Sequence, residues 1–297
     1  MLSKDTTKPG FVGLGLMGSR LVKRLHTAGW GVQAWNRSPE KAKEVSQQGI
    51  PIAASIAALC AGSNVILSCL ANDAAVRAVY FAEGGILHLA KVGTIVLEMS
   101  TISRDLSLEI HREGARHGLR VLDLAISGST PAVEAGTITL LAGGDRETFD
   151  ECAPIFESLS RQCFLVGAEG AGVEMKLVVN LLLGTGMAAI AEAISLGEHL
   201  KIEKNTLLDV LSKTAVIPPA FLGKFKKIKS DDYSPEFPLR LMSKDMNLVS
   251  EAAASTGAKL PVASAVQKVF ATYAGSIGDL DLSAITPGVI AGDRSEA

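Results

Sequence analysis

The first half of the chain alternates short apolar runs with segments in which apolar residues recur at helical spacing. The apolar runs predict strands over residues 11–14, 31–35, 64–70, 94–98 and 120–124. Helical patterns such as residues 18–28 separate the early runs. This alternation favours an α/β fold, in which helices cover both faces of a parallel sheet.

A further apolar run over residues 137–142 follows the previous strand closely and is closed by Gly143 and Gly144. A parallel crossover needs a dozen or more residues, whereas antiparallel strands can be joined by a short connection. We therefore expect this run to form an antiparallel strand at the edge of the sheet.

After Gly167 the strand patterns nearly vanish and helical patterns take over. We expect helices over residues 174–200, 205–213, 220–229, 239–256 and 261–273. The first of these is apolar nearly all round at its centre, which is typical of a helix buried between domains or subunits. The sequence therefore predicts a dinucleotide-binding domain over residues 1–168 and an all-helical domain over residues 169–297, with a frayed end at 291–297.

The composition agrees with two folded domains. The chain has 297 residues, of which 47% are hydrophobic and 20% charged, and this excludes wholesale disorder. The net charge of −2 gives no general nucleic-acid footprint. We interpret the basic run of Lys224, Lys226, Lys227 and Lys229 as a solvated helix face.

The sequence predicts a cytoplasmic protein with neither nucleic-acid nor membrane partners. The short polar start lacks a signal-peptide core, and the most apolar stretch, residues 177–191, is shorter than the roughly 18 residues of a membrane span. The four cysteines form no C-x-x-C pair, so we expect buried thiols and no metal site. The five histidines are scattered, and we expect surface or helix positions without a catalytic role.

Residues 13–18 read Gly-x-Gly-x-x-Gly between a predicted strand and a predicted helix. In a dinucleotide-binding fold the first glycine allows a tight turn, the second lets the backbone approach a pyrophosphate, and the third allows close helix packing. The N–H groups and the positive dipole end of the helix then attract the phosphates. The candidate cofactor residues in this loop are Gly13, Leu14, Gly15, Leu16, Met17 and Gly18.

The second predicted strand ends in Asn36, Arg37 and Ser38, which we also assign to the cofactor site. An NAD site usually carries an Asp or Glu about 20 residues after the glycine loop, where it holds the ribose diol. No carboxylate stands here to repel a 2′-phosphate, and the planar guanidinium of Arg37 can bind one. We therefore predict a preference for NADP(H), with NAD(H) as the alternative cofactor if Arg37 only stacks on adenine.

The most informative stretch runs from Gly167 to Asn180 and places Lys176 and Asn180 one helical turn apart on the same face. Both interrupt an apolar surface near the predicted domain boundary. Lys176 has two interpretations. Its amine can reach out to water, or it is desolvated and available for acid–base catalysis.

Four motifs spread over most of the chain together resemble the β-hydroxyacid dehydrogenase family, which includes 3-hydroxyisobutyrate dehydrogenase and tartronate semialdehyde reductase. They are residues 13–18, 123–136 and 167–180 and the pair Lys244-Asp245. The resemblance implies an N-terminal Rossmann domain, an all-helical C-terminal domain, a long helix that joins them and an active site in the cleft. It also implies a homodimer or a homotetramer.

The resemblance further implies a role for each matching residue. Lys176 matches the catalytic lysine, and Asn180 matches the asparagine that positions the substrate. Ser127, Gly128 and Ser129 match the loop that holds the substrate carboxylate. The matching cofactor positions outside the glycine loop are Leu70, Ala71, Thr101, Phe237 and Lys244.

These roles imply an NADP-dependent oxidoreductase that interconverts a short β-hydroxyacid and its semialdehyde, with Lys176 as the general acid and base. The expected partner is a small carboxylated aldehyde or hydroxyacid. Two departures from the family pattern concern the substrate. Residues 123–126 read Asp-Leu-Ala-Ile where the family has Asp-Ala-Pro-Val, and Ser129 stands in place of a glycine.

Two other functions stay open. An imine reductase shares the fold and the cofactor, but those relatives usually lack the lysine found here at position 176. A non-catalytic dinucleotide-binding protein is the second, since some relatives in chromatin have lost the lysine and carry extra reader segments. The His–Lys pair of 6-phosphogluconate dehydrogenase is absent, because Met175 precedes Lys176, and we therefore exclude that substrate.

Overall fold

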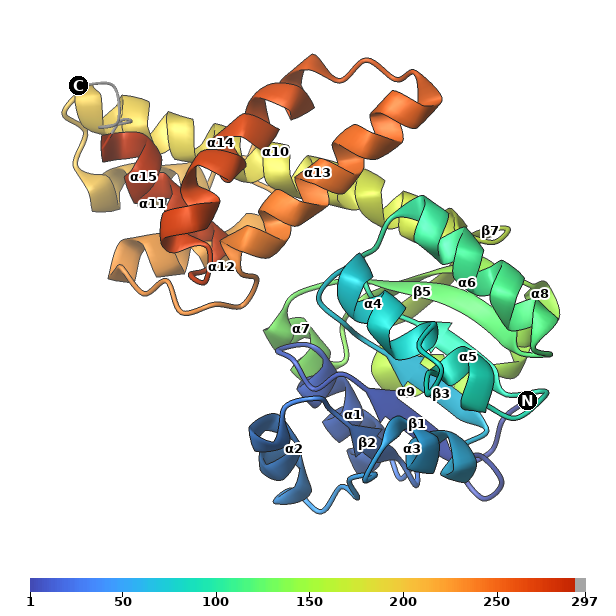
Figure 1. The fold of residues 1–297 in the computed structure, drawn as a ribbon. Helices are drawn as coiled ribbons and strands as arrows, with labels where there is room; N and C mark the ends of the chain where they lie inside the picture. The colour runs from blue at the N-terminus through green and yellow to red at the C-terminus, as the bar shows by residue number, and fades with distance from the viewer. Residues whose placement is uncertain (292–297) are drawn as a thin grey trace. The chain divides into compact units, whose positions relative to one another are not determined.

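The computed structural model describes residues 1–291 and contains two compact units, Met1–Lys176 and Leu177–Ala297 (Figure 1). We call them the N-terminal unit and the helical unit. The division lies within a long helix, whereas the predicted domain boundary at residue 168 lies just before that helix and stays a prediction. Residues 292–297 of the predicted frayed end lie outside the described residues.

The N-terminal unit contains one seven-stranded sheet with the strand order β2-β1-β3-β4-β5-β6-β7. Strands β1 to β5 are parallel, β6 runs antiparallel to β5, and β7 is parallel to β6. The strands are β1 (Pro9–Val12), β2 (Gln33–Trp35), β3 (Val65–Ser68), β4 (Ile95–Glu98), β5 (Arg120–Ser127), β6 (Thr139–Gly144) and β7 (Gln162–Gly167).

The predicted strands correspond to β1 to β6, with ends that shift by a few residues. The antiparallel direction of β6 is confirmed. Its predicted edge position is wrong, because β7 pairs with its outer side. The sequence pattern missed β7 because every residue of that strand is exposed or only half-buried, and its Phe164 is 51% exposed.

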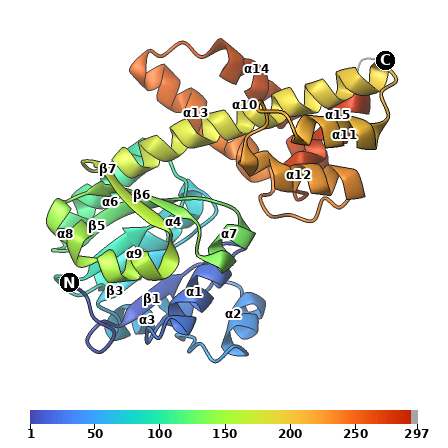
Figure 2. The same cartoon turned by 180° about the vertical axis from the view of Figure 1, so that it is seen from behind.

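Ten helices begin in the N-terminal unit and cover both faces of the sheet (Figures 1 and 2). They are α1 (Gly18–Thr27), α2 (Pro39–Ser46), α3 (Ile56–Gly62), α4 (Asp73–Tyr80), α5 (Ile86–Leu89), α6 (Arg104–Arg116), α7 (Thr130–Ala135), α8 (Arg146–Glu151), α9 (Ala153–Leu159) and α10 (Ala171–His199). The α/β class predicted from the alternating pattern is confirmed.

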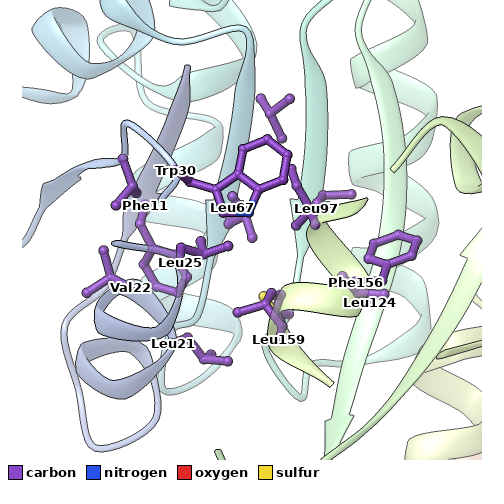
Figure 3. Close-up of a cluster of buried hydrophobic side chains, with 14 of the residues drawn as sticks. Phe11, Leu21, Val22, Leu25, Trp30, Leu67, Leu97, Leu124, Phe156 and Leu159 are labelled. Carbon is purple, nitrogen blue, oxygen red and sulfur yellow. The ribbon is translucent and has the colours of Figure 1, made fainter. Parts of the chain in front are cut away.

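Two hydrophobic cores lie on opposite faces of this sheet, because neighbouring residues of a strand point to opposite sides. Phe11, Leu67 and Leu97 face a core that they share with α1 and α9, as Figure 3 shows. The next or preceding residue on each of these strands joins a second core, built with α3 to α6. Both faces of the central strands are therefore covered by hydrophobic side chains, and a ligand can reach these strands only where they end.

The helical unit continues α10 and adds five further α-helices and a short 3₁₀ helix within the described residues. Buried residues of α10, among them Met187, Ile190 and Ile194, form its core together with the other helices. The added helices are α11 (Lys204–Ser212), α12 (Pro219–Ser230), α13 (Leu239–Thr256), α14 (Pro261–Ile277), η1 (Leu282–Ala284) and α15 (Ile285–Ala291).

By length and composition alone, α10 is apolar enough to cross a membrane. The sequence analysis counted only residues 177–191 as apolar. The helix covers residues 171–199, and 18 consecutive residues within it are apolar enough to span a membrane. Only 44% of its most apolar window is buried inside the structure. However, the buried residues pack into the core of the helical unit, and the core helix of a folded protein meets the same criteria.

The four cysteines carry free thiols whose surroundings disfavour ionisation. Burial, together with the negative charge of Glu98, raises the pKa of Cys69 to about 12. Burial likewise raises the pKa of Cys60 to about 11 and that of Cys152 and Cys163 to about 12. Among residues 1–291 no group of three or more His, Cys, Asp or Glu side chains is placed to hold a metal ion.

The basic run on α12 is a solvated face only in part, which corrects the sequence interpretation. Lys224 is 6% exposed and Lys227 is 9% exposed. The Lys224 amine donates to Asp281 Oδ2 at 2.8 Å, and the Lys227 amine donates to the Ser234 carbonyl oxygen at 2.8 Å. A helical pattern cannot reveal this burial, because the acceptor Asp281 lies more than 50 residues further along the chain.

Asp281 → Asn should destabilise the helical unit by about 3 kcal/mol at neutral pH, because the variant leaves the buried Lys224 without its main charge partner. Burial raises the pKa of Asp281, but the attraction and hydrogen bond of Lys224 outweigh it and hold the pKa below its usual value. The pair therefore stabilises the fold above about pH 4, and this stabilisation is lost as the pH falls through the lowered pKa. The difference in free energy of unfolding between wild type and variant, measured by urea unfolding, should shrink toward acid pH.

Lys229 → Ala is the matched control on the same helix. Lys229 is exposed and pairs with the exposed Asp209 at 2.9 Å, and surface pairs of this kind contribute only about 0–1 kcal/mol. Equal losses of stability in the two variants would contradict a special contribution of the buried pair.

Candidate active site

The glycine loop follows β1 and opens α1, as the sequence predicts, and its three glycines differ in their surroundings. Gly13 has a φ of +97°, which L-residues rarely adopt, and it turns the chain tightly. A Cβ at Gly18 would lie 1.9 Å from the Gly13 carbonyl oxygen, so the third glycine allows the helix to pack against the loop. A Cβ at Gly15 would meet nothing within 4 Å, and this open space suits the approach of a pyrophosphate.

The start of α1 is electrostatically open to an anion. Its N-cap residue, Met17, makes no side-chain capping bond, and no acidic residue lies in the first turn. The positive end of the helix dipole is therefore not neutralised by a side chain of the helix itself. Together with the space at Gly15, this arrangement fits a dinucleotide phosphate.

The loop after β2 is tied to the glycine loop by Asn36. The Asn36 side chain accepts a hydrogen bond from Leu14 N at 2.9 Å and donates one to the Ser38 carbonyl oxygen at 3.1 Å. Arg37 is exposed, and within residues 1–291 its guanidinium forms no ion pair. The amide of Asn36 therefore shapes the loop, while Arg37 is available to a ligand.

The remaining predicted residues of the N-terminal unit gather at one edge of the sheet. Leu70 and Ala71 follow β3, Thr101 follows β4, and Ser127 ends β5. Because β1 to β5 are parallel, their carboxyl ends, including the glycine loop, lie on the same edge. This is the edge at which open α/β sheets bind their ligands.

Glu98, for which the sequence carried no signal, helps to hold the loops after β3 and β4 together. Its buried carboxylate accepts a hydrogen bond from Ser100 N at 2.7 Å and another from the hydroxyl of Ser68. The Ser68 hydroxyl is in turn 2.6 Å from the hydroxyl of Tyr80. The Ser100 hydroxyl accepts a bond from Leu70 N at 2.8 Å, so the loops after β3 and β4 are held together.

Burial raises the pKa of Glu98, although the hydrogen bonds from Ser100 and Ser68 oppose that rise. Burying a carboxyl group costs free energy, because the group is removed from water. The donors that bind Glu98 lie next to the predicted cofactor residues Leu70 and Thr101. No local pattern could have marked Glu98, because it ends an otherwise ordinary buried strand.

The loop between β5 and α7 carries the predicted carboxylate site. Ser127 ends β5, and Ser129 is the N-cap residue of α7 without a side-chain capping bond. Gly128 has a φ of +150°, and a Cβ there would lie 2.7 Å from Ile138 Cγ2, so a larger residue would strain the loop. In the part of the chain that the structure describes, neither serine hydroxyl forms a hydrogen bond, and both can serve a ligand.

Lys176 is the last residue of the N-terminal unit and lies in the second turn of α10. The residue as a whole is 9% exposed, so most of it is withdrawn from water. The start of α10 is fixed by Asp123 of β5, which accepts hydrogen bonds from Gly170 N and Val173 N. Of the two interpretations of Lys176, the burial favours the desolvated amine over the side chain that reaches into solvent.

In the helical unit, the side chains of Asn180 and Lys244 both contact the carboxylate of Asp245. Asn180 is fully buried and donates from Nδ2 to Asp245 Oδ2 at 2.6 Å. The Lys244 amine lies 2.7 Å from Asp245 Oδ1. Asn180 Oδ1 is buried and has no hydrogen-bond partner among the described residues. A buried acceptor of this kind is costly unless it receives a donor.

Phe237 stands on the segment before α13, and this segment is pinned by main-chain bonds. Phe237 N donates to Asp281 Oδ2 at 3.1 Å, and the Phe237 carbonyl oxygen accepts from Leu282 N at 2.9 Å. The buried pair of Asp281 and Lys224 therefore also fixes the backbone on which Phe237 is carried.

The predicted residues thus fall into two groups, one in each unit. The loops at the carboxyl edge of the sheet form the first group: the glycine loop, Asn36 to Ser38, Leu70, Ala71, Thr101 and Ser127 to Ser129. Lys176 lies in the same unit, on α10, whose start is bonded to β5. The second comprises Asn180 and Lys244, whereas Phe237 is held in that unit by a separate network. The sequence carried no signal for Glu98 or His111 and marked Asp245 only as part of the pair Lys244-Asp245. It predicted that Asp123 is a hydrogen-bonding loop residue and not an acid catalyst, whereas the structure places Asp123 within β5. Asp123 and Asp245 both lie inside its motifs, which was the signal available.

Two family descriptions cover nearly the whole chain. Residues 8–167 match the NAD binding domain of 6-phosphogluconate dehydrogenase. Residues 170–287 match the NAD-binding domain of NADP-dependent 3-hydroxyisobutyrate dehydrogenase.

Individual relatives agree with these matches. Glyoxylate/succinic semialdehyde reductase 1 of Arabidopsis thaliana is 33% identical, over 94% of this chain and 97% of the relative. The cytokine-like nuclear factor N-PAC of Drosophila melanogaster is 31% identical over 88% of this chain, which spans only 44% of that longer protein. The crystal structure of 3-hydroxyisobutyrate dehydrogenase from Salmonella typhimurium superposes with a TM-score of 0.87 at 27% identity, over 95% of this chain and 99% of that chain.

The family assignment follows from the full-length match and from the two domain matches. Together with the relatives it supports an NAD(P)-dependent oxidoreductase that acts on hydroxyacids. The chain belongs to the β-hydroxyacid dehydrogenase family.

Proposed function

We propose that the protein is an NADP-dependent enzyme that interconverts a short β-hydroxyacid and its semialdehyde, with Lys176 as general acid and base. The observation that carries this proposal is the buried Lys176 on a helix whose start is fixed to β5, the strand that also ends in Ser127. The nicotinamide of the bound cofactor supplies or accepts the hydride. In the reducing direction Lys176 donates a proton to the carbonyl oxygen, and in the oxidising direction it removes the hydroxyl proton.

The substrate carboxylate is proposed to bind at Ser127, Gly128 and Ser129. Two hydroxyls and the backbone N–H groups of a tight loop provide charge-assisted donors. Asn180 is proposed to position the substrate, because its buried Oδ1 is an acceptor that lacks a donor among the described residues. A substrate hydroxyl would satisfy it.

The proposed cofactor site uses the residues at the carboxyl edge of the sheet. The glycine loop binds the pyrophosphate, and Asn36, Arg37 and Ser38 surround the adenosine ribose. Leu70, Ala71 and Thr101 contact the nicotinamide half, and their loops are fixed through Glu98. Phe237 and Lys244 of the helical unit are proposed as further cofactor contacts.

We further propose a cytoplasmic homodimer or homotetramer. The support is a set of exposed apolar side chains on α10, namely Val178, Leu182 and Leu196, with the exposed Leu200 just after the end of the helix. Apolar side chains left exposed on a helix can contribute to an interface between subunits.

Arg37 → Ala should raise the KM for NADPH about 10- to 100-fold and leave the KM for NADH nearly unchanged. A charge-assisted hydrogen bond contributes roughly 1.5–3 kcal/mol, and 1.4 kcal/mol corresponds to a factor of ten. The measurement is steady-state oxidation of the two cofactors at saturating aldehyde. Lys43 → Ala, an exposed lysine at the end of α2, is the control for the change in net charge. A wild-type KM for NADH well below that for NADPH would overturn the assigned preference.

Reduction assays with NADPH should identify one carboxylated aldehyde as the substrate. The panel contains glyoxylate and the succinic, methylmalonic and tartronic semialdehydes, with a sulfonated aldehyde as a second anion and propanal as an uncharged control. Turnover of a cyclic imine without turnover of any aldehyde would favour the imine reductase. Cofactor binding without any turnover would favour a non-catalytic protein.

Lys176 → Ala should lower kcat for that aldehyde by about 10²- to 10⁴-fold, the usual contribution of general acid–base catalysis. The dissociation constant of NADPH, measured by fluorescence quenching, should change little, since the glycine loop is untouched. Lys268 → Ala, an exposed lysine on α14, serves as the control. Full turnover by Lys176 → Ala would remove the lysine from the mechanism.

A further inference from the structure

The first turn of α10 has no capping side chain of its own, because the residue before the helix is Gly170. Its N–H groups are satisfied from a distant strand. Asp123 Oδ1 accepts from Gly170 N at 2.8 Å, and Asp123 Oδ2 accepts from Val173 N at 2.9 Å. A single carboxylate on β5 thus performs the function that an N-cap side chain usually performs from within the helix.

Asp123 is 1% exposed, and its third partner is also buried. His111 of α6, which is 4% exposed, places Nε2 at 2.9 Å from Asp123 Oδ1. The other ring nitrogen lies 4.0 Å from the exposed Glu169. His111 therefore holds the carboxylate in one orientation and joins α6 to the contact between β5 and α10.

The contact between α10 and the sheet leaves no room for a side chain. A Cβ at Gly172 would lie 2.5 Å from the Leu141 carbonyl oxygen and 2.8 Å from Asp123 Oδ2. A Cβ at Gly143 of β6 would lie 2.6 Å from Asp123 Oδ1. The helix start therefore rests directly on the backbone of β5 and β6, at a position set by the hydrogen bonds of Asp123.

Asp123 and Ser127 lie on β5 at positions i and i+4, and both therefore lie on the same face of the strand. Lys176 follows the capped Val173 by three residues on α10. We infer that Asp123 is a positioning residue, which sets the place of the Lys176 amine relative to the carboxylate loop of Ser127 to Ser129. This inference rests on the proposed function, and it adds a residue that determines the rate without touching the substrate.

Asp123 → Asn tests the inference with little change of volume. An amide keeps one acceptor oxygen and brings an NH₂ group, so one of the two N–H groups of the helix start loses its acceptor in either orientation. The lysine is then displaced, and a displacement of about 1 Å can cost about 100-fold in rate. We expect kcat for the aldehyde identified with the panel to fall at least tenfold, while the NADPH dissociation constant stays within about twofold.

A double-mutant cycle separates positioning from a general loss of structure. If Asp123 acts through Lys176, then Asp123 → Asn should reduce the residual kcat of Lys176 → Ala by no more than about threefold. A merely structural role would reduce kcat by the same factor in both backgrounds. Amide hydrogen exchange should report faster exchange at Gly170 and Val173 in Asp123 → Asn, independently of activity.

Asp145 → Asn is the matched control, because Asp145 caps α8 by accepting from Thr148 N at 2.7 Å and that helix carries no site residue. Its kcat should equal that of the wild type even if its melting temperature falls. Should Asp123 → Asn fail to fold, Gly172 → Ala displaces the same helix start by steric contact and should show the same loss and the same non-additivity with Lys176 → Ala.

The outcomes distinguish the inference from the function on which it rests. If Lys176 → Ala abolishes turnover while a folded Asp123 → Asn keeps the kcat of the wild type, only the inference is wrong. Equal losses from Asp123 → Asn in both backgrounds also contradict it. If Lys176 → Ala keeps full turnover, the proposed role of the lysine fails and the inference fails with it.

Discussion

The free N–H groups at the start of a helix need acceptors. Two helices that begin in the N-terminal unit differ in this respect, because a side chain of the protein supplies the acceptors at α10 but no capping side chain does so at α1. At α10 the acceptor is internal, since the carboxylate of Asp123 neutralises the positive end of the helix from β5. At α1 no side chain of the helix caps the first turn, and the space beside Gly15 is open. An anionic cofactor is therefore attracted to α1 and not to α10. The closed helix start can carry a lysine at a fixed place, and the open one can receive a phosphate.

Buried carboxylates recur as the means by which this chain fixes its functional backbone. Glu98 accepts from Ser100 N, beside Thr101. Asp123 accepts from the start of the lysine helix. Asp281 accepts from Phe237 N. Each carboxylate is buried among several donors, so the cost of removing its charge from water is offset by hydrogen bonds that also define a single loop conformation. At Glu98 burial raises the pKa in spite of these hydrogen bonds, so the compensation there is incomplete.

What could be predicted from the sequence depends on how far apart the interacting residues are. The strands β1 to β6 and the roles of Gly13 and Gly18 follow from local patterns, because period, turn and close approach are properties of short segments. The edge strand β7 was missed because its residues are exposed or half-buried, and the burial of Lys224 was missed because its acceptor lies elsewhere in the chain. Asp123 lay inside a motif, but its partners at the start of α10 are 47 and 50 residues away, and no spacing rule connects them. For the same reason the motif residues, Asp123 among them, could be named, whereas the partners of the buried carboxylates could not.

The proposed chemistry and the substrate identity reside on different elements, so they can vary independently. Lys176 depends on α10 and its contact with β5, which use main-chain groups and glycines that tolerate little change. The carboxylate loop departs from the family pattern at Ser129, whose hydroxyl makes no capping bond to α7 and is free to meet a ligand. An added hydroxyl beside an anion site gives one more donor and removes space. With the substrate carboxylate bound as proposed, the loop would favour a compact, strongly hydrogen-bonding anionic group over a bulky substituent at that point, without any change in the proposed lysine chemistry.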